Sequence, residues 1–509
     1  MIIGRFLDLA AARYPDKSAI VSGDRKFTYT QLREWVQRLM TGFSKLGVRK
    51  GDRICTLMEN CSEQIEIYLA AARLGAVFTP LNFRLKETEL LHIIQDARPS
   101  VLVTDENFEE TAWHIAPNLA KRRGLFSTSA SPRDGFHAYE SLVGDSVPFS
   151  GSPDLTAEDP CQILYTSGTT GQPKGVVLTH ENVVWNTINM LQARGDRPED
   201  VALIVGPLFH AAALNSHYTS RLALGATSII MSKFDPVELM EVIQNERVTV
   251  VSGTPTMFIM LMESCAAGQY DTSSVTTLTS GADKLADSTK KAILEYFPGA
   301  GGIYDVYGCT ECSPCVTTLD KRDSLRKTGS VGRPLPFVEV KLLDDEGQPV
   351  PAGEPGEIVV RGPVVMKGYY GRPEETAKVL KHGWLYTGDV AWADEEGFLY
   401  VVDRKKDIIV SGGENIFARE VEEHLLTHPS VLKAAVFGLP DPKWGEKVAA
   451  AVVLKQGQSP DKKDLLKHLR GRISNYKMPK EVFFLDQLPE GSTGKVQKQV
   501  LRETYTAEA

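Results

Sequence analysis

The sequence has no apolar run long enough to cross a membrane. Its longest apolar segments, such as Val201–Phe209, are far shorter than the roughly 20 residues that a spanning helix needs. The N-terminal segment carries Arg5, Asp8 and Arg13 inside its apolar pattern, which predicts an amphipathic helix and not a secretory signal. We therefore expect a cytoplasmic protein with no transmembrane segment.

Cysteine and positive charge are also scarce. The seven cysteines are odd in number and form no disulfide framework, which indicates a reducing compartment. Lysine and arginine total 57 against 65 aspartates and glutamates, which gives a net charge of -8. Nucleic acids and anionic membranes attract basic surfaces, so we expect neither of them to be the main partner.

One group of cysteines has the spacing of a metal motif. Cys309, Cys312 and Cys315 form C-x2-C-x2-C, which opens a bacterial iron–sulfur motif. The fourth cysteine and its proline are missing, and closed thiolate sites need four ligands. We therefore favour small residues packed in a turn over a metal centre.

Length and pattern indicate more than one domain. A chain of 509 residues is longer than one hydrophobic core usually supports. Thr30–Leu46 has the spacing of an amphipathic helix that ends at Gly47, and Arg53–Met58 is typical of a buried strand. A helix from Ser62 and a strand at Val101 follow. This alternation predicts a doubly wound α/β architecture up to about residue 400.

The pattern changes after Pro334. Short strand-like segments separated by turn-forming residues indicate an antiparallel β region, and a compact α+β pattern follows the charged segment Asp403–Asp407. We therefore predict two domains. The first, residues 1–405, contains α/β subdomains and a small β region, and the second, residues 406–509, is a small α+β domain on a hinge.

A glycine-rich segment, YTSGTTGQPKG at Tyr165–Gly175, lies between a strand-like run and a helix predicted from His180. Its glycines allow backbone N–H groups to converge, its hydroxyls add donors, and Lys174 supplies the cation that a polyphosphate needs. Lys174 precedes Gly175 and not Ser or Thr, so the segment is not a Walker A loop. On this segment alone, a flexible polar loop stays an alternative. The predicted phosphate-binding residues are Thr166, Ser167, Gly168, Thr169, Thr170, Gly171 and Lys174.

Further motifs follow in order along the chain. Together with the glycine-rich segment, they resemble the acyl-adenylate-forming superfamily, which includes acyl-CoA synthetases, peptide-synthetase adenylation domains and beetle luciferases. The resemblance spans essentially the whole length. The motifs are PLFHAAAL at Pro207, SGADKL at Ser280, YDVYGCTE at Tyr304, YTGD at Tyr386, DRKKDIIVSGGENI at Asp403 and STGKVQK at Ser492.

The resemblance implies a reaction and its catalytic residues. A carboxylate would attack the α-phosphate of ATP and release pyrophosphate, and a thiol would then attack the acyl-adenylate. Lys495 matches the lysine that bridges the carboxylate and the α-phosphate. Glu311 matches the ligand of Mg2+, Thr310 a contact to the α-phosphate, and His210 a residue at the carboxylate pocket.

The resemblance also implies a nucleotide site. Asp389 matches the carboxylate that accepts both ribose hydroxyls, and Arg404 would add a ribose or phosphate contact. The residues expected to line the adenine pocket are Gly281, Ala282, Asp283 and Tyr307, with Tyr307 stacking on the ring.

Coenzyme A is the expected thiol, because no carrier domain follows the last motif. The resemblance implies that the small domain rotates at Lys406 and presents the loop around Gly413 to the pantetheine. Trp444 and Lys477 resemble contacts to the CoA nucleotide, although solvated surface charge is the alternative.

The acid is harder to predict. The segment 210–224, with 303–306, should border the acyl pocket and is mainly small or apolar, so a second carboxylate is disfavoured. A fatty acid is the leading expectation, and a benzoate-like, cinnamate-like or alicyclic acid stays open. Because fold alone does not fix function, a catalytically silent nucleotide or acyl binder is the alternative of another class, and a homodimer is left open.

Overall fold

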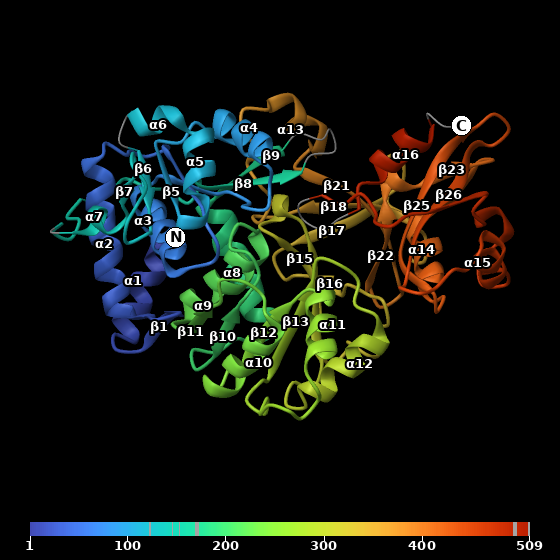
Figure 1. Ribbon diagram of the computed structural model, residues 1–509, viewed down its shortest axis with the longest axis horizontal. Helices are drawn as coiled ribbons and strands as arrows, with labels where there is room; N and C mark the ends of the chain where they lie inside the picture. Colours follow the sequence, from blue (N-terminus) through green and yellow to red (C-terminus); the bar gives the residue numbers. More distant parts are fainter. Residues whose placement is uncertain (122–123, 145, 152, 168–172, 492–495, 507–509) are drawn as a thin grey trace. The chain divides into compact units, whose positions relative to one another are not determined.

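A computed structural model describes residues 1–121, 124–144, 146–151, 153–167, 173–491 and 496–506 (Figure 1). The chain forms two compact units. Unit 1 comprises Met1–Val340 and Val360–Leu385, and unit 2 comprises Lys341–Val359 and Tyr386–Ala509. The predicted boundary between residues 405 and 406 falls inside unit 2, and that division of the chain stays a prediction.

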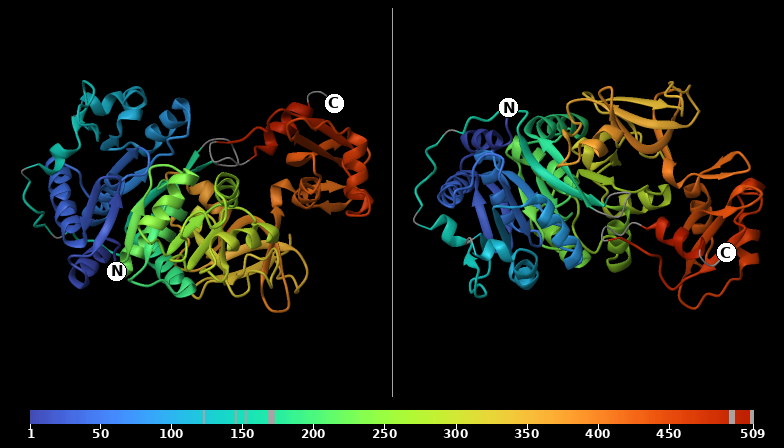
Figure 2. Two further views of the ribbon diagram at one scale, coloured as in Figure 1. Left: turned by 60° about the horizontal axis from the view of Figure 1, so that its bottom comes forward. Right: turned by 90° about the horizontal axis from the view of Figure 1, so that it is seen from above.

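Unit 1 contains two large sheets, which can be followed by colour in Figures 1 and 2. In the first sheet, the strands from β8 through β7 are parallel, and β9 and β19 continue the sheet in antiparallel fashion. In order across this sheet the strands are β19 (Gly368–Tyr369), β9 (Pro173–Thr179), β8 (Pro160–Ser167), β4 (Val77–Pro80), β3 (Arg53–Leu57), β5 (Val101–Thr104), β6 (Leu125–Ser127) and β7 (His137–Ala138).

The second sheet is parallel from β14 to β1, with antiparallel strands at both edges. In order its strands are β16 (Arg333–Pro334), β15 (Cys315–Leu319), β14 (Ile303–Gly308), β13 (Thr277–Gly281), β12 (Val250–Gly253), β10 (Val201–Ile204), β11 (Thr227–Ile230), β1 (Ser18–Ser22) and β2 (Arg25–Thr28). Two sheets of mostly parallel strands with helices on their faces confirm the predicted doubly wound α/β architecture.

One group of helices packs together inside unit 1. Nearly every residue of α3 is buried, including Glu63, Gln64 and Glu66, which is typical of a helix covered on all sides. The helices of this group are α1 (Gly4–Arg13), α2 (Tyr29–Lys45), α3 (Ser62–Leu74), α8 (His180–Arg194), the π-helix η2 (Ala212–Tyr218) and α9 (Thr219–Leu224).

Most of the remaining helices of unit 1 pack on the faces of the sheets. Leu239, Phe258 and Ile293, from three of these helices, join one apolar cluster with Leu203 and Leu278 of the second sheet. The helices are α4 (Glu87–Ala97), α5 (Glu109–Ile115), α6 (Pro117–Lys121), α7 (Glu140–Val143), α10 (Pro236–Asn245), α11 (Pro255–Ser264), α12 (Asp287–Tyr296) and α13 (Pro373–Val379), with the 3-10 turns η1 (Glu106–Phe108) and η3 (Thr310–Cys312).

A small five-stranded sheet is the β region predicted after Pro334. Its strands are β17 (Glu339–Leu343), β18 (Gly356–Arg361), β20 (Leu380–Lys381), β21 (Trp384–Ala393) and β22 (Leu399–Arg404).

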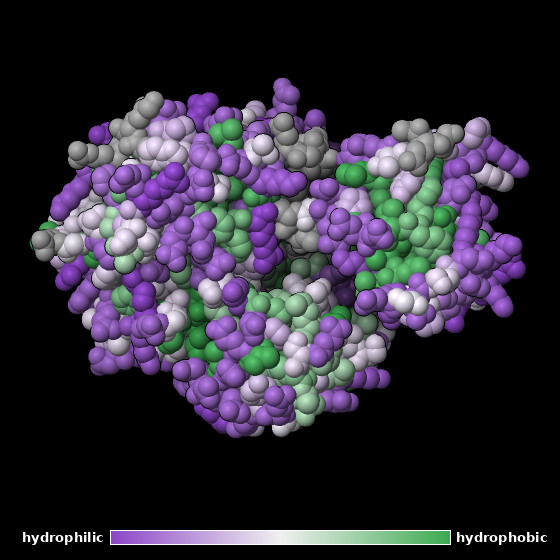
Figure 3. Space-filling model, in the orientation of Figure 1, coloured by the Kyte–Doolittle hydropathy of each residue, from purple (hydrophilic) through white to green (hydrophobic). Residues whose placement is uncertain are grey.

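The rest of unit 2 is a sheet with helices on both faces, as the α+β pattern predicted. Val436 and Phe437 are neighbours on β25, yet Val436 joins a cluster with α14 and α15, whereas Phe437 joins a cluster with α16. Figure 3 shows apolar residues at the surface of unit 2 over β25 and β26. Its elements are β23 (Ile409–Ser411), β24 (Glu414–Ile416), β25 (Val431–Asp441), β26 (Gly445–Leu454), β27 (Glu481–Phe484), α14 (Ala418–Leu426), α15 (Lys462–Leu469), α16 (Lys498–Thr506), η4 (Lys405–Asp407) and η5 (Asn475–Lys477).

No helix in the described part of the chain is long and apolar enough to span a bilayer.

Candidate active site

Several predicted residues meet at the carboxyl edge of the second sheet of unit 1. β13 ends at Gly281, whose partner on β14 is Val306, next to Tyr307. Ala282 follows with a φ of 70°, a left-handed conformation that costs a non-glycine residue free energy and often occurs at functional sites. Asp283 is exposed beside it. In open α/β sheets, ligands bind outside the carboxyl ends of the strands.

The turn after β14 holds Thr310 and Glu311. Gly308 pairs with Cys315 on β15, and a Cβ at Gly308 would lie 1.8 Å from the carbonyl oxygen of Pro314. Only glycine fits this close approach, after which η3 presents Thr310 and Glu311 while Cys312 is buried. All seven cysteines lie in the described part of the chain and form no disulfide bonds.

Glu311 lies in a polar network with residues of β9, β19 and α13. Its Oε1 accepts a hydrogen bond of 3.0 Å from the Tyr369 hydroxyl. The Nζ of Lys174 lies 5.4 Å from the centroid of the Tyr369 ring and forms an ion pair with Glu375. Burial and the Glu311 carboxylate raise the pKa of Tyr369, and the hydrogen bond from Lys174 lowers the pKa of Glu375. These contacts bring a carboxylate to the hydroxyl of Tyr369 and a cation of the predicted phosphate site to its ring.

The described ends of the glycine-rich segment belong to the antiparallel strands β8 and β9. Thr166 pairs with Lys174, and the Ser167 backbone pairs with Pro173, so the described ends of the segment face each other. The predicted contacts Gly168, Thr169, Thr170 and Gly171 lie outside the described residues, as does Lys495.

His210 follows β10 on a loop that Asn60 holds in place. The amide of Asn60 donates to the Gly206 carbonyl at 3.0 Å and its oxygen accepts from the Leu208 N–H at 2.8 Å. The ring of Phe209 packs edge-on against Phe83, and the partly exposed His210 ring lies 4.5 Å from Phe209 between centroids. The loop therefore places His210 at the same sheet edge as Gly281.

The segment predicted to border the acyl pocket begins with the π-helix η2. π-helical turns are rare and frequently occur at functional sites. Ala212 at its start is exposed, whereas Asn215 is buried and exchanges two hydrogen bonds, of 2.8 and 2.9 Å, with Gln162 of β8. The amide pair fixes η2 against the first sheet.

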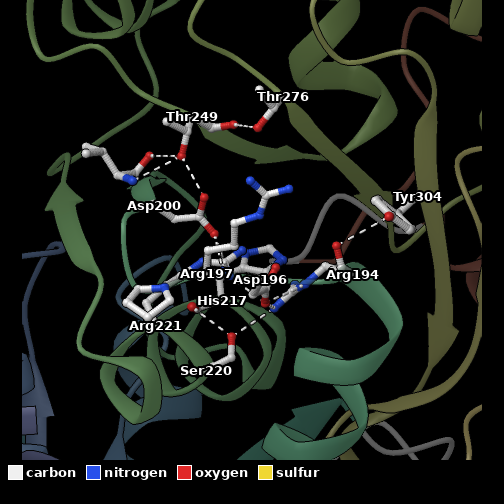
Figure 4. Close-up of polar contacts among 12 residues, drawn as sticks. Arg194, Asp196, Arg197, Asp200, His217, Ser220, Arg221, Thr249, Thr276 and Tyr304 are labelled. Atoms are coloured by element: carbon white, nitrogen blue, oxygen red, sulfur yellow. Dashed lines mark hydrogen bonds and ion pairs between the residues drawn. The ribbon is translucent and has the colours of Figure 1, made fainter.

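A buried cluster of charges anchors the other end of this segment (Figure 4). Asp196 Oδ2 accepts from Arg194 Nη2 at 2.8 Å and forms an ion pair with Arg221, and all three side chains are at most 1% exposed. Arg194 also donates to the Ser216 carbonyl and the Ser220 hydroxyl, both at 2.8 Å. These bonds tie the end of α8 to η2 and α9.

The charge cluster lies at the amino ends of the strands, away from the predicted nucleotide residues. Asp200 and Tyr304 stand at the starts of β10 and β14, and the Tyr304 hydroxyl donates to the Arg194 carbonyl at 3.3 Å. Burial favours protonation of Asp196, but the two guanidinium groups outweigh it and hold the pKa of Asp196 below its usual range. Burial and the same guanidinium groups lower the pKa of His217 to about 3.

The other predicted residues lie in unit 2. Asp389 is buried on β21, and its Oδ1 lies 3.2 Å from Nε of Arg404 on the paired strand β22. Lys406 is exposed on η4, and Gly413 adopts a φ of 86°. The Gly412 N–H donates to the Trp444 carbonyl at 2.8 Å, so Trp444 packs beside the Gly413 loop. Lys477 forms bonds of 2.7 Å to both carboxylate oxygens of Glu420.

The donor set at Glu311 suits Mg2+ held mainly by a nucleotide. Mg2+ usually binds one or two carboxylates and completes its shell with phosphate oxygens and water. Oε2 of Glu311 receives no hydrogen bond from a described residue, and no cluster of three acidic, histidine or cysteine ligands exists in the described part of the chain. One partly exposed carboxylate next to the predicted phosphate site therefore fits a metal that arrives with ATP.

Sequence reasoning missed Tyr369 and Glu375. Both lie about 200 residues beyond Lys174, in a region whose pattern indicated only antiparallel strands. No local signal marks them, because they reach Lys174 and Glu311 through the pairing of β19 with β9.

Comparisons with known proteins agree with this geometry. A family model described as "AMP-binding enzyme" matches residues 7–370, and one described as "AMP-binding enzyme C-terminal domain" matches residues 420–495. The chain is 42% identical to a feruloyl-CoA synthase of Amycolatopsis sp. over 96% of each chain. It is 36% identical to an indoleacetate–CoA ligase of Aromatoleum aromaticum over 99% of this chain and 98% of that one.

Solved structures show the same architecture. The crystal structure of ATP-bound MatB from Rhodopseudomonas palustris aligns with a TM-score of 0.89 at 31% identity over 99% of each chain. The family matches confirm the superfamily that the ordered motifs indicated. The chain is therefore a member of the AMP-binding enzyme family and belongs with its ATP-dependent acyl-CoA ligases, the AMP-forming acid–thiol ligases.

Proposed function

We propose that this enzyme activates an aromatic carboxylic acid, of the arylalkenoic or arylacetic kind, through an acyl-adenylate and transfers it to coenzyme A. The similarity to a feruloyl-CoA synthase and an indoleacetate–CoA ligase over almost the whole of each chain carries this proposal. Both relatives are named for aromatic acids, so the aryl alternative is preferred over the fatty acid that the sequence pattern favoured.

The pocket-bordering segment supports an acid with one carboxylate. Arg221 is the arginine in this segment, and its charge is compensated by Asp196, with Asp200 Oδ2 3.9 Å from its Nη1. A guanidinium held in this way is not available to pair with a second carboxylate of a substrate. The segment also contains small and apolar residues such as Ala211 and Leu214, together with the neutral imidazole of His217.

In the first half-reaction, a carboxylate oxygen of the acid bonds to the α-phosphorus of ATP, and the bond to the diphosphate breaks. Both reactants are anions, so positioned cations and donors should supply most of the catalysis, with about 3 kcal/mol from each well-placed group. We assign Lys174, with the hydroxyls and amides of residues 166–171, to the β- and γ-phosphates. Lys495 bridges the carboxylate and the α-phosphate, and Thr310 contacts the α-phosphate.

Other residues hold the nucleotide and orient the acid. Tyr307 stacks on the adenine, which lies along Gly281, Ala282 and Asp283, and His210 orients the carboxylate. In unit 2, the proposed ribose contacts are Asp389 and Arg404. Glu311 would hold Mg2+, which supplies neutralisation of the charge on the phosphates when it is bound.

In the second half-reaction, the thiol sulfur of coenzyme A bonds to the acyl carbon, AMP leaves, and the thiol proton passes to solvent or to the phosphate. Residues of unit 2 are assigned to this step. The proposed set is Lys406 as the hinge, Gly413 beside the pantetheine, and Trp444 and Lys477 at the CoA nucleotide. The bonds of Lys477 to Glu420 must open for it to take this role.

An acid panel tests the substrate class. AMP release is measured with ATP, Mg2+ and CoA for ferulate, cinnamate, indoleacetate, benzoate, octanoate, palmitate and malonate, with Lys495→Ala as the inactive control. We expect an aromatic acid to have the highest kcat/KM, at least about tenfold above both fatty acids, which corresponds to about 1.4 kcal/mol of transition-state binding. A preference for octanoate or palmitate would overturn the aromatic assignment.

The same panel tests the alternative that the protein is a catalytically silent nucleotide or acyl binder. A catalytically silent binder would bind ATP but release no AMP with any acid. That result would refute the enzyme proposal as a whole.

A further inference from the structure

The hydroxyl of Tyr369 is directed at the carboxylate that we assign to Mg2+. It donates to Oε1 of Glu311 over 3.0 Å, across 58 residues of sequence. In the described part of the chain, no hydrogen bond or ion pair occupies the other oxygen, Oε2. One oxygen of Glu311 is therefore held by the protein, and the other accepts no hydrogen bond from a described residue.

Tyr369 is itself held by its strand and its neighbours. Its backbone pairs with Val176 of β9, and its N–H donates to the Thr376 hydroxyl at 2.9 Å. The Lys174 ammonium lies over its ring, 5.4 Å from the centroid, in a cation–π contact. The hydroxyl is thus presented in a fixed direction.

Glu311 is fixed by its backbone as well. Its carbonyl accepts a hydrogen bond of 2.8 Å from the Met366 N–H, three residues before Tyr369. The segment 366–369 therefore donates hydrogen bonds to both the main chain and the side chain of Glu311. A carboxylate that ligates a metal needs such a partner, because an oriented oxygen loses less entropy when it binds.

We propose that Tyr369 is a positioning residue for the metal site: its hydroxyl orients the carboxylate of Glu311 so that Oε2 faces the cation bound with ATP. This inference rests on the metal role proposed for Glu311. It does not depend on which acid the enzyme uses.

Metal binding without catalysis tests the inference. The full-length enzyme is titrated with Mn2+ in the presence of ATP and without an acid, and free Mn2+ is followed by electron paramagnetic resonance. Loss of a hydrogen bond behind a metal ligand typically reduces metal affinity by 10–100-fold. We expect Tyr369→Phe, which keeps the ring over Lys174, to weaken Mn2+ binding by about tenfold.

Three comparisons make the result specific. Glu311→Gln should lose at least as much Mn2+ affinity as Tyr369→Phe. Tyr370→Phe is the matched control, because the Tyr370 ring packs against the apolar cluster of Val77, Ile163 and Val177 and its hydroxyl forms no hydrogen bond with a described residue. Binding of ATP in EDTA should be within about twofold of the parent in Tyr369→Phe, which also reports that the variant is folded.

Kinetics provide a second readout. With any acid that supports turnover, Tyr369→Phe should raise the Mg2+ concentration needed for half-maximal adenylation about tenfold and recover the parent kcat at saturating Mg2+.

Parent-like Mn2+ affinity in Tyr369→Phe, with a clear loss in Glu311→Gln, would overturn the positioning role. Parent-like affinity in Glu311→Gln would overturn the metal role of Glu311 and this inference with it. Failure of the aromatic assignment in the acid panel would change neither result.

Discussion

Asp196→Asn should be among the most destabilising polar substitutions in unit 1. The asparagine keeps the size of Asp196 but removes the charge between Arg194 and Arg221, whose side chains are at most 1% exposed. Among the described residues, the acidic partner left to Arg221 would be Asp200, whose Oδ2 lies 3.9 Å from Nη1 of Arg221. Removing one partner from a buried ion pair costs about 3–5 kcal/mol because the other charge stays buried. With about 2.1 cal/mol/K of unfolding entropy per residue, a unit of this size should lose about 4–6 °C in its unfolding midpoint.

Calorimetry of the parent and the variant measures this shift, and Asp271→Asn is the matched control. Asp271 pairs with Arg247 at 2.7 Å in the same unit, but both side chains are at least half exposed, so the control should melt like the parent. Arg221→Met in the Asp196→Asn background should recover part of the lost unfolding temperature, because it removes the buried charge that has no partner. The reasoning is refuted if Asp196→Asn and Asp271→Asn melt at the same temperature.

Three further substitutions have defined outcomes. His180 is fully buried, and burial lowers its pKa to about 4. Its contribution to the free energy of unfolding is therefore present above pH 6.5 and is lost as the pH falls toward 4. Urea titrations should show that the parent loses about 2 kcal/mol of unfolding free energy between pH 7 and pH 5, and that His180→Gln has a flatter pH profile. Gly308→Ala would place a methyl group 1.8 Å from the Pro314 carbonyl oxygen and displace η3, so the rate of pyrophosphate exchange should fall by at least about 100-fold. An unchanged rate would contradict the assigned role of η3. Lys174→Met removes a charge-assisted contact worth about 1.5–3 kcal/mol and should raise the KM for ATP by about 10–100-fold, whereas a change confined to the KM for the acid would exclude a phosphate role.

Local periodicity predicted the elements well. The helix expected at Thr30–Leu46 is α2, Tyr29–Lys45, and the strand expected at Arg53–Met58 is β3, Arg53–Leu57. These segments were predictable because each buries one face whose spacing is visible in the sequence. The Thr28 and Gln31 side chains that cap α2 lie within its first turn, so the helix start is also encoded locally.

The contacts within the site depend on distant parts of the chain. The motifs identified Glu311 and Lys174, but neither their link through Tyr369 nor the ion pair with Glu375 has a local pattern. Arg221 lies in a stretch with small and apolar residues, and only the fold shows that Asp196 compensates its charge. The cytoplasmic location, the homodimer and the roles of the predicted site residues stay predictions.

Three asparagines on one side of α8 hold this helix in place in unit 1 through hydrogen bonds to the main chain. Asn182 donates to the carbonyls of Pro363 and Val365, Asn186 accepts from the Cys315 N–H, and Asn189 accepts from the Phe337 N–H. A slide or rotation of α8 would break main-chain contacts to three separate segments at once. Adaptation to acids of a new shape should therefore proceed through the exposed start of η2, at Ala212, and leave α8 unaltered. Directed evolution of substrate range would do best to randomise that position and spare the asparagines.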